Sequence, residues 1–201
     1  MRILFVRHGE STGNLTNCFY DSPHVELTEK GREQALETGK RLAELLREDE
    51  CDAVYCSTWL RAMQTCIVAI EAAKTIRKVV TFDERLKERS VGSLAGKRLD
   101  DFGEDCHDNL ISRDIYAGIW TYDSPRSKEF GVETLPELRR RVRSFLDETY
   151  MKHSNSTIVV FSHGGLGRMF QAICGGWPED GRFDKIEFLQ NGEIIELFFN
   201  G

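Results

Sequence analysis

Short apolar runs and longer amphipathic stretches alternate along this chain. Residues 2–6 form an apolar run without alternation, which predicts a strand that is buried on both faces. Apolar residues then recur at helical spacing from residue 35 to residue 46. Because Thr28 is a suitable N-cap, we expect a helix that begins there and ends near residue 48. The pattern further predicts a strand at 53–56, a helix at 60–74 and a strand at 79–82.

The same alternation returns in the C-terminal third. The pattern there predicts a helix at 138–150, a strand at 157–161, a helix at 166–174 and two strands at 185–189 and 194–199. Asn191-Gly192 lies between the last two strands and indicates a type I′ hairpin turn. Strands that alternate with helices are typical of a parallel sheet covered on both faces. We therefore expect an α/β fold: a three-layer α/β/α sandwich around a mainly parallel sheet with an antiparallel edge strand.

The interval from residue 97 to residue 133 departs from this pattern. It is polar, rich in aspartate and glutamate, and contains the aromatic residues Tyr116, Trp120 and Tyr122. Its length favours an inserted cap region over an ordinary loop, although composition alone is equally consistent with a surface excursion. With this insertion included, we expect residues 1–201 to form a single domain.

Composition and charge narrow the class of protein. Hydrophobic residues make up 40% of the chain and charged residues 30%, which indicates a packed core rather than a disordered chain. The formal net charge of −6 argues against nucleic acid or an anionic membrane as a partner, but it permits a local basic pocket. No apolar run is long enough for a membrane span or a signal peptide, so we expect a cytoplasmic protein with reduced cysteines. The sequence does not indicate an oligomeric state.

Basic and histidine side chains follow three of the predicted strands. They are Arg7 and His8 after the strand at 2–6, Arg61 after the strand at 53–56, and His163 after the strand at 157–161. In an open parallel sheet, ligands bind at the carboxyl ends of the strands. These four side chains are therefore expected to converge on one spot, in a protein that is acidic overall.

Phosphate is the ligand that such groups suit best. Guanidinium groups donate paired hydrogen bonds to phosphate oxygens, and histidine can donate to phosphate or attack it to form a covalent intermediate. Gly9, Gly164 and Gly165 allow backbone N–H groups to approach a ligand, and the helix predicted to follow them presents its positive end there. Each residue alone has an ordinary structural explanation, whereas together they indicate a phosphate site.

The same residues carry a resemblance to a known family. Arg7-His8-Gly9-Glu10 resembles the signature of the histidine phosphatase superfamily, which includes the cofactor-dependent phosphoglycerate mutases. Four further segments resemble the family's other blocks and occur in the family's order. They are LTEKGREQA (27–35), YCSTWLRAMQT (55–65), ERSVGSLAG (88–96) and VVFSHGG (159–165). Together the blocks extend from residue 3 to about residue 170.

The resemblance implies a role for each matching residue. His8 would be the nucleophile, and Glu88 would donate a proton to the leaving oxygen and then activate water. The groups implied to hold the phosphate are Arg7, Asn14, Arg61 and His163, with the backbone at Gly164. Glu10 would orient a pocket arginine without itself contacting the phosphate. No metal and no cofactor is implied, because cationic side chains supply the positive charge.

One stretch resembles the mutases of this family, and four features depart from them. Residues 14–19 (NLTNCF) resemble the corresponding mutase segment, including the Asn17 and Phe19 positions. The departures are Val91 in place of a tyrosine, Ile119-Trp120 in place of two adjacent arginines, Gly165 in place of an asparagine, and a shorter chain.

The departures bear on the substrate, because the resemblance implies that the missing groups grip the carboxylate and second phosphate of phosphoglycerate. Each charge-assisted hydrogen bond contributes about 1.5–3 kcal/mol, so phosphoglycerate would be poorly held and water would accept the phosphoryl group instead. We therefore expect a phosphomonoester hydrolase that acts through a phosphohistidine intermediate on a small phosphorylated metabolite. A cofactor-dependent phosphoglycerate mutase is the alternative.

Three other classes of protein are weaker candidates. A cysteine-dependent phosphatase needs five residues between its cysteine and arginine, whereas Cys56 and Arg61 are separated by four. A metallohydrolase would need local ligand spacing, and His8 and His163 lie on separate predicted strands. A catalytically inactive phospho-ligand-binding module is a remote alternative, because the matching catalytic positions are all filled.

Overall fold

The computed structural model describes every residue except 17, 48–49, 99–128 and 179–182, together with all side chains outside these ranges other than that of Asp184. Five strands form one sheet in the order β3-β2-β4-β1-β5. They are β1 (Arg2–Arg7), β2 (Cys51–Cys56), β3 (Val80–Phe82), β4 (Thr157–Ser162) and β5 (Ile194–Phe198). The first four strands are parallel and β5 runs antiparallel to β1, which confirms the predicted α/β class with an antiparallel edge strand.

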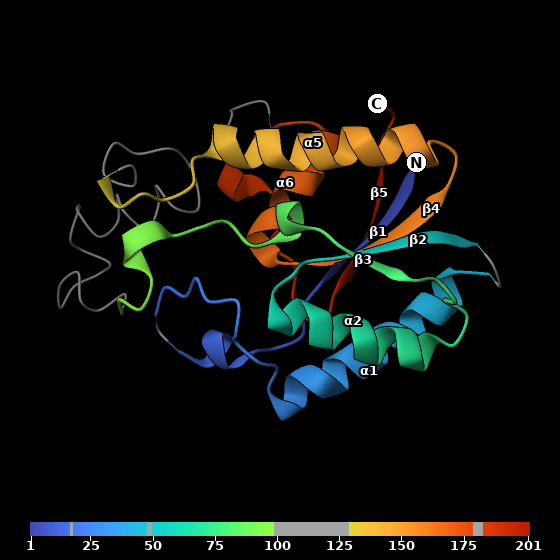
Figure 1. Ribbon diagram of the computed structural model, residues 1–201, viewed down its shortest axis with the longest axis horizontal. Helices are drawn as coiled ribbons and strands as arrows, with labels where there is room; N and C mark the ends of the chain where they lie inside the picture. Colours follow the sequence, from blue (N-terminus) through green and yellow to red (C-terminus); the bar gives the residue numbers. More distant parts are fainter. Residues whose placement is uncertain (17, 48–49, 99–128, 179–182) are drawn as a thin grey trace.

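Helices cover both faces of this sheet (Figure 1). They are α1 (Glu29–Leu45) and α2 (Leu60–Ala73) on one face, and α5 (Leu135–His153) and α6 (Gly164–Gly175) on the other. Short 3₁₀ helices occupy connecting segments: η1 (Thr12–Leu15), η2 (Glu84–Leu86), η3 (Gly92–Leu94) and η5 (Phe183–Lys185). The described part of the chain contains no helix with the length and apolarity needed to cross a membrane.

Helix starts follow the capping signals in the sequence. Thr28 caps α1, and its side-chain oxygen accepts a hydrogen bond of 3.0 Å from the backbone of Gly31, as predicted. Thr134 caps α5 in a reciprocal capping box with Glu137, so this helix begins at residue 135 rather than at the predicted 138. Both helices thus start where a side chain satisfies backbone N–H groups that have no partner within the helix.

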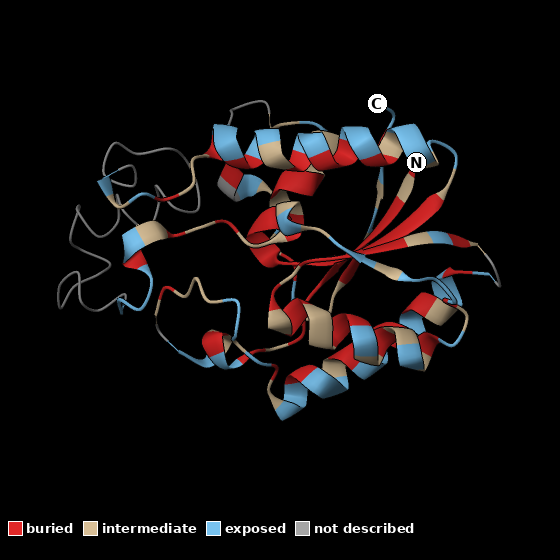
Figure 2. Ribbon diagram, viewed as in Figure 1, coloured by how far each residue is buried: buried red, intermediate tan, exposed pale blue. Residues whose placement is uncertain are grey.

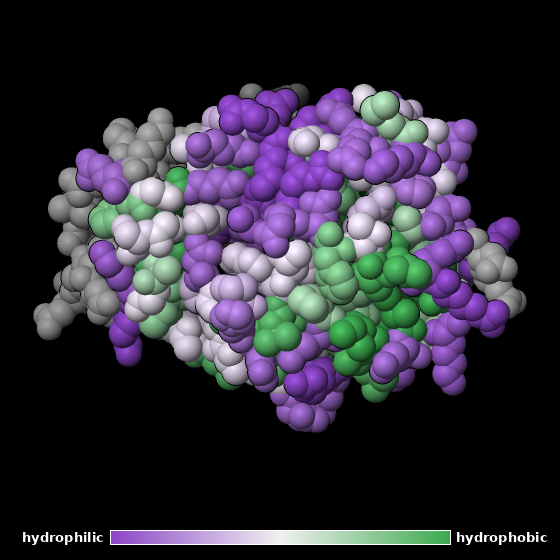
Figure 3. All heavy atoms as spheres, viewed as in Figure 1, coloured by the Kyte–Doolittle hydropathy of each residue, from purple (hydrophilic) through white to green (hydrophobic). Residues whose placement is uncertain are grey.

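Alternate strand residues build the two halves of the core. Ile3 and Phe5 of β1 pack under α5 and α6, whereas Leu4 and Val6 pack toward α1 and α2. All four side chains are completely buried, which explains why β1 reads as a continuous apolar run. In Figure 2 the buried residues follow the central strands and the inner faces of the helices. Exposed apolar side chains gather over α2 and β3, at one edge of the sheet (Figure 3).

The predicted C-terminal hairpin is wrong in its pairing. Residues 185–189 do not form a strand, and β5 pairs with β1, with Ile194 opposite Val6. A turn is present at the predicted residues, but it is not the predicted type I′, because Gly192 has a φ of +78° whereas Asn191 does not have a positive φ. The N–H of Gly192 donates to the carbonyls of Arg7 and His8. Since β4 occupies one edge of β1, the antiparallel partner satisfies the backbone groups of the other edge. Residues 188–189 instead lie against the Arg7 side chain.

The cap region predicted at 97–133 falls largely outside the described residues. Its described flanks pack on the segment that follows β1. Phe19 exchanges backbone hydrogen bonds with Lys97 and Gly96, at 3.0 and 2.7 Å. A small apolar cluster joins the two flanks and consists of Phe19, Val91, Leu94 and Val132, with Phe130 packed against it.

Candidate active site

Three neighbouring strands end at the same level, and this places the predicted site residues together. Arg7 lies opposite Ser162 in the pairing of β1 with β4, and the backbone N–H of His8 donates to the Ser162 carbonyl over 3.0 Å. On the other side of β4, the N–H of Ser57 donates to the Phe161 carbonyl over 2.9 Å. The residues after β1, β2 and β4 therefore meet at one edge, as expected for parallel strands.

His8 is held by a hydrogen bond at each ring nitrogen. Nδ1 lies 2.7 Å from the Gly9 carbonyl, and Nε2 lies 3.1 Å from Nε of Arg61. A carbonyl only accepts and a guanidinium only donates, so the proton resides on Nδ1 and Nε2 carries a lone pair. Burial, followed by the positive charges of Arg61 and Arg7, holds the pKa of His8 well below its ordinary value of 6.5. The ring is therefore a neutral imidazole with a nucleophilic nitrogen.

Arg61 lies at the start of α2 and is 1% exposed. Its guanidinium lies over the rings of Trp59 and Tyr20, at 4.6 and 5.1 Å from their centroids, and donates to the Ser22 carbonyl over 3.1 Å. The helix is tied to the residues after β1, because Thr65 accepts a hydrogen bond of 3.0 Å from the backbone of Gly9.

Arg7 is almost as deeply buried, at 8% exposure. It donates to the Leu189 carbonyl and lies 4.6 Å from the centroid of the Phe188 ring. Its Nε is buried without a hydrogen-bond partner among the described residues. Burial lowers the pKa of this guanidinium, and the negative charge of Glu88 opposes that effect.

His163 follows β4 and is fully buried. Its ring lies edge-on to His8, with centroids 5.2 Å apart, and its Nε2 lies 2.8 Å from the Ser57 hydroxyl. Its Nδ1 is buried and has no partner among the described residues. Burial and then the charge of Arg61 hold the pKa of His163 well below 6.5.

The strand-end cluster of Arg7, His8, Arg61 and His163 thus carries positive charge without a direct ion-pair partner among the described residues. In the described part of the chain, no carboxylate oxygen lies within 4.0 Å of either guanidinium. Buried charges are costly unless they are paired, and buried polar atoms normally have partners. Two unpaired guanidinium groups and an unpartnered Nδ1 in one cluster therefore make a site for an anion.

Glu88 follows η2 and reaches the N-terminus of α6. Its Oε2 accepts from the backbone of Gly165 at 2.9 Å, and its Oε1 accepts from Leu166 at 3.0 Å and from Arg89 at 2.9 Å. A carboxylate is favoured at this end of a helix. Residue 165 must be small here, because a Cβ on Gly165 would lie 2.7 Å from Oε1 of Glu88.

Gly164 opens α6, directly after His163. The N–H groups of Gly165 and Leu166 are taken by Glu88, and that of Gly167 by the His163 carbonyl at 2.9 Å. The first N–H groups of a helix have no partner within it, so the Gly164 N–H is a donor at the edge of the strand-end cluster.

Asn14 and Glu10 lie on the segment after β1, but neither contacts a pocket arginine. Asn14 donates from Nδ2 to the Tyr20 hydroxyl over 2.9 Å, so it contacts the ring that covers Arg61 rather than Arg61 itself. The expectation for Glu10 is wrong: its carboxylate accepts from Thr28 and pairs with Lys30, each near 2.8–2.9 Å. These bonds fix the start of α1 against the strand end.

At the closest point of that junction, Gly9 and Glu10 meet Gly31 through backbone atoms. A Cβ added to Gly9 would lie 2.3 Å from the carbonyl oxygen of Gly31, and a Cβ on Gly31 would lie 1.9 Å from that of Glu10. No side chain fits between the residues after β1 and the first turn of α1. The two glycines thus allow the helix start to touch the segment that carries His8.

Several residues of the site have no signal in the sequence pattern. Phe188 and Leu189 were expected in a strand, and they instead contact Arg7. Trp59 stands two residues before Arg61, a spacing that a single sequence does not mark as functional. Cys56, the cysteine weighed as a nucleophile, is completely buried, and burial raises the pKa of its thiol well above its ordinary value.

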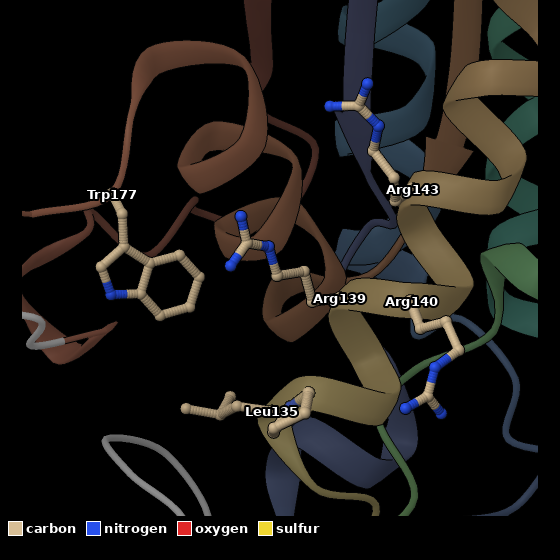
Figure 4. Close-up of a pocket in the computed structure, with 6 residues that line it drawn as sticks. Leu135, Arg139, Arg140, Arg143 and Trp177 are labelled. Atoms are coloured by element: carbon tan, nitrogen blue, oxygen red, sulfur yellow. The ribbon is translucent and has the colours of Figure 1, made fainter.

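A cavity of about 450 Å³ lies elsewhere, beside α5 (Figure 4). Its lining residues are Leu135, Pro136, Arg139, Arg140, Arg143 and Trp177. None of the predicted site residues lines it, and it lacks a histidine or another nucleophile. The chemistry therefore points to the strand ends rather than to this cavity.

The sheet order and the strand-end cluster define an α/β protein with a candidate anion site at the carboxyl ends of its central strands. The chain belongs to the histidine phosphatase superfamily (branch 1), whose family model matches residues 3–201. This confirms the resemblance that the sequence blocks indicated.

Curated relatives of this chain are described as phosphoglycerate mutases. The chain is 37% identical over 141 residues to a 2,3-bisphosphoglycerate-dependent phosphoglycerate mutase of Streptococcus gordonii, which covers 67% of this chain and 58% of the relative. A mutase of the same description from Streptococcus sanguinis is 36% identical over 111 residues, 55% of this chain and 47% of the relative. The chain thus spans about half the length of the curated relatives that it matches.

Solved structures share the fold at low sequence identity. A mycobacterial glucosyl-3-phosphoglycerate phosphatase in complex with VO3 has a TM-score of 0.75 at 21% identity, covering 97% of this chain and 90% of that one. Bacillus stearothermophilus YhfR has a TM-score of 0.76 at 23% identity, with coverage of 97% and 89%. These similarities establish the fold. The reaction has to be inferred from the residues of the candidate site.

Proposed function

We propose that this protein is a phosphomonoesterase that transfers the phosphoryl group of a small phosphorylated metabolite to His8 and then to water. The observation that carries the proposal is the state of His8, a neutral imidazole whose Nε2 lone pair faces the guanidinium of Arg61. A phosphate bound by Arg7 and Arg61 would bring its phosphorus to that nitrogen. The backbone N–H of Gly164 and the Nδ1 of His163 are further donors for it.

In the first step, the Nε2 lone pair of His8 attacks phosphorus while the bond to the leaving oxygen breaks. The hydrogen bond from Arg61 then passes from Nε2 to a phosphoryl oxygen, where negative charge develops. Glu88 gives its proton to the leaving oxygen. The proton of His8 stays on Nδ1, which donates it as a hydrogen bond to the Gly9 carbonyl.

In the second step, water attacks the phosphohistidine and Glu88 takes a proton from it. The bond between phosphorus and Nε2 breaks, inorganic phosphate leaves, and His8 returns to the neutral imidazole. Positive charge comes from guanidinium groups in both steps, so the proposal includes no metal and no cofactor. Among the described residues, no group of three histidine, cysteine or acidic side chains lies together as metal ligands would.

A phosphoglycerate mutase is the second candidate, and the similarity to the streptococcal mutases favours it. Two features support hydrolysis instead. Val91, at the position where we expect a mutase tyrosine, is 5% exposed and packs in the cluster with Phe19 and Leu94. Gly165 has no side chain to reach a substrate, and its place is taken by the Glu88 carboxylate.

The test is to trap the phosphoryl group. We expect labelled substrate, quenched within one turnover, to leave a phosphate on the protein that is stable in base and labile in acid. His8→Ala should abolish the label and His153→Ala, at the far end of α5, should retain it. No label with any phosphate ester would favour a binding module. Isomerisation of 3-phosphoglycerate faster than phosphate release would identify a mutase, and activity lost to EDTA would indicate a metallohydrolase.

A further inference from the structure

The guanidinium of Arg141, on α5, binds the backbone of the segment that carries Glu88. Its Nη1 donates to the carbonyls of Arg85 and Lys87, at 2.7 and 2.8 Å, and its Nη2 lies 3.5 Å from the carbonyl of Glu88 itself. These residues span the end of η2 and the connection that follows it, and no strand or longer helix satisfies those carbonyls. The side chain of Arg141 therefore restrains the path of the backbone at residues 85–88.

The guanidinium is in turn fixed by Glu133. Nε and Nη2 of Arg141 make paired hydrogen bonds with the Glu133 carboxylate, at 2.8 and 2.6 Å. The backbone of Glu133 is also tied to the residues just after Glu88, because its N–H donates to the Ser90 carbonyl at 3.0 Å and its carbonyl accepts from the side-chain Nε of Arg89 at 2.6 Å. The side chain of Arg141 is 14% exposed, so solvent weakens these contacts little.

The neighbouring backbone is held from the other side. The Ser162 hydroxyl at the end of β4 donates to the Leu86 carbonyl over 2.7 Å, and the α6 N-terminus holds the Glu88 carboxylate. Four successive carbonyls, from residue 85 to residue 88, thus each lie within hydrogen-bond distance of a side chain from α5 or β4. The carboxylate of Glu88 has a defined place only because both its backbone and its oxygens are held.

We propose that Arg141 is a positioning residue for Glu88, and that it supports proton transfer to the leaving oxygen without touching substrate. The inference depends on the proposed function, since Glu88 acts only if a phosphoryl group is transferred. Arg141 contacts the Glu133 carboxylate and the main-chain carbonyls of the Glu88 segment, and it makes no hydrogen bond to the strand-end cluster. Its loss should therefore affect the acid step and leave attack by His8 largely intact.

The experiment compares two substrates that differ in the leaving group alone, p-nitrophenyl phosphate and phenyl phosphate. Nitrophenolate leaves without a proton, whereas phenolate benefits from one. We expect Arg141→Gln to lower kcat/KM about 100-fold for phenyl phosphate and less than about 5-fold for p-nitrophenyl phosphate. Glu88→Gln should give the same pattern. The double variant should lose no more than Glu88→Gln alone, because both changes remove one function.

Arg140→Gln is the matched control, one residue away on the same helix. Arg140 is exposed, and Figure 4 shows its side chain directed away from Trp177 at the edge of the cavity. It should retain wild-type kinetics on both substrates. If Arg141→Gln fails to fold, Arg141→Lys is the second variant, because lysine keeps the positive charge but not the planar, paired donors of the guanidinium. We expect it to lower kcat/KM for phenyl phosphate about 10-fold, again with a smaller loss for p-nitrophenyl phosphate.

Two outcomes would overturn the inference. Equal losses on both substrates would mean that Arg141 acts on folding or binding in general. Additive losses in the double variant would mean that it acts independently of Glu88. A failure of the proposed function is distinguishable from both, because wild-type protein would then form no phosphohistidine with p-nitrophenyl phosphate.

Discussion

Nε of Arg61 donates a hydrogen bond to Nε2 of His8 over 3.1 Å. The proposed nucleophilic atom is thus oriented before any substrate arrives, by the same group that would then bind the phosphoryl oxygen. Burial lowers the pKa of Arg61, and the charges of Glu88 and Asp21 offset this only in part, so this guanidinium is held in a costly environment. Such an arrangement predicts that activity and stability respond in opposite ways when the charge is removed.

Arg61→Met tests this prediction. The apolar side chain fills the buried space between Trp59 and Tyr20 without a charge to desolvate. We expect kcat to fall by about 10²–10³, the effect of one lost transition-state donor. The free energy of unfolding in urea should stay the same or rise. A stability loss above about 3 kcal/mol, with activity retained, would make Arg61 a structural residue instead.

Stability should depend on pH through the two buried histidines. The pKa values of His8 and His163 are lowered well below 6.5 in the folded protein, so between those values and about 6.5 the unfolded chain binds more protons. The free energy of unfolding should therefore fall as pH drops below about 6.5, by up to about 1.4 kcal/mol per pH unit for each histidine. Urea unfolding at several pH values would measure this slope.

The control for that slope is the variant pair His8→Asn and His163→Asn, alone and combined. Each removes one titrating group and keeps a polar side chain at the position. The acid-side slope should become shallower with each substitution. If the double variant shows the same dependence of unfolding free energy on pH, the acid sensitivity belongs to carboxylates. The conclusion that burial lowers the pKa of the two histidines would then be wrong.

Gly165→Ala should displace the Glu88 carboxylate. The added Cβ would lie 2.7 Å from Oε1, so the carboxylate must shift from its present place against the backbone N–H groups of α6. We expect kcat for phenyl phosphate to fall at least about 10-fold, with a smaller loss for p-nitrophenyl phosphate. Gly175→Ala, at the last residue of the same helix, is the control, because nothing lies within 4 Å of its Cβ. Equal kinetics for Gly165→Ala and wild type would contradict the placement of Glu88.

Cys56 should be unreactive in the folded protein. Its pKa is raised well above the ordinary value by burial, so the thiol stays protonated near neutral pH. We expect native protein treated with iodoacetamide to keep its full activity and, by mass spectrometry, to carry no label on Cys56. Rapid inactivation with modification at that residue would revive the cysteine-phosphatase class.

The periodicity of hydrophobic residues and the residue types at the strand ends predicted most of the helices and strands and the grouping of the candidate site residues. The run at residues 3–6 was identifiable because both faces of β1 are buried, and His8 and His163 were paired correctly because parallel strands end at one edge. The β5 pairing was missed, since Asn191-Gly192 defines a turn but not which strand lies beside the chain that leaves it. Local signals describe local geometry, and partners far along the chain lie beyond them.

Side-chain contacts over long sequence distances were likewise out of reach. Arg141 stands 53 residues from Glu88, in a run of arginines whose other members are exposed, and nothing in the pattern separates it from them. Glu10 was assigned to the pocket by its place in a block, whereas its carboxylate faces α1. The direction of a side chain at a strand end depends on the packing of the whole segment, which periodicity does not encode.

The glycine junction between the strand end and α1 has a mechanical consequence. Gly9 and Gly31 meet through main-chain atoms, so no rotamer can change the spacing between the helix and the turn that bears His8. Thermal motion of side chains is therefore not transmitted to the imidazole along this path. In-line displacement requires the attacking nitrogen to be placed accurately relative to phosphorus. A direct backbone contact between α1 and the turn that bears His8 favours that accuracy.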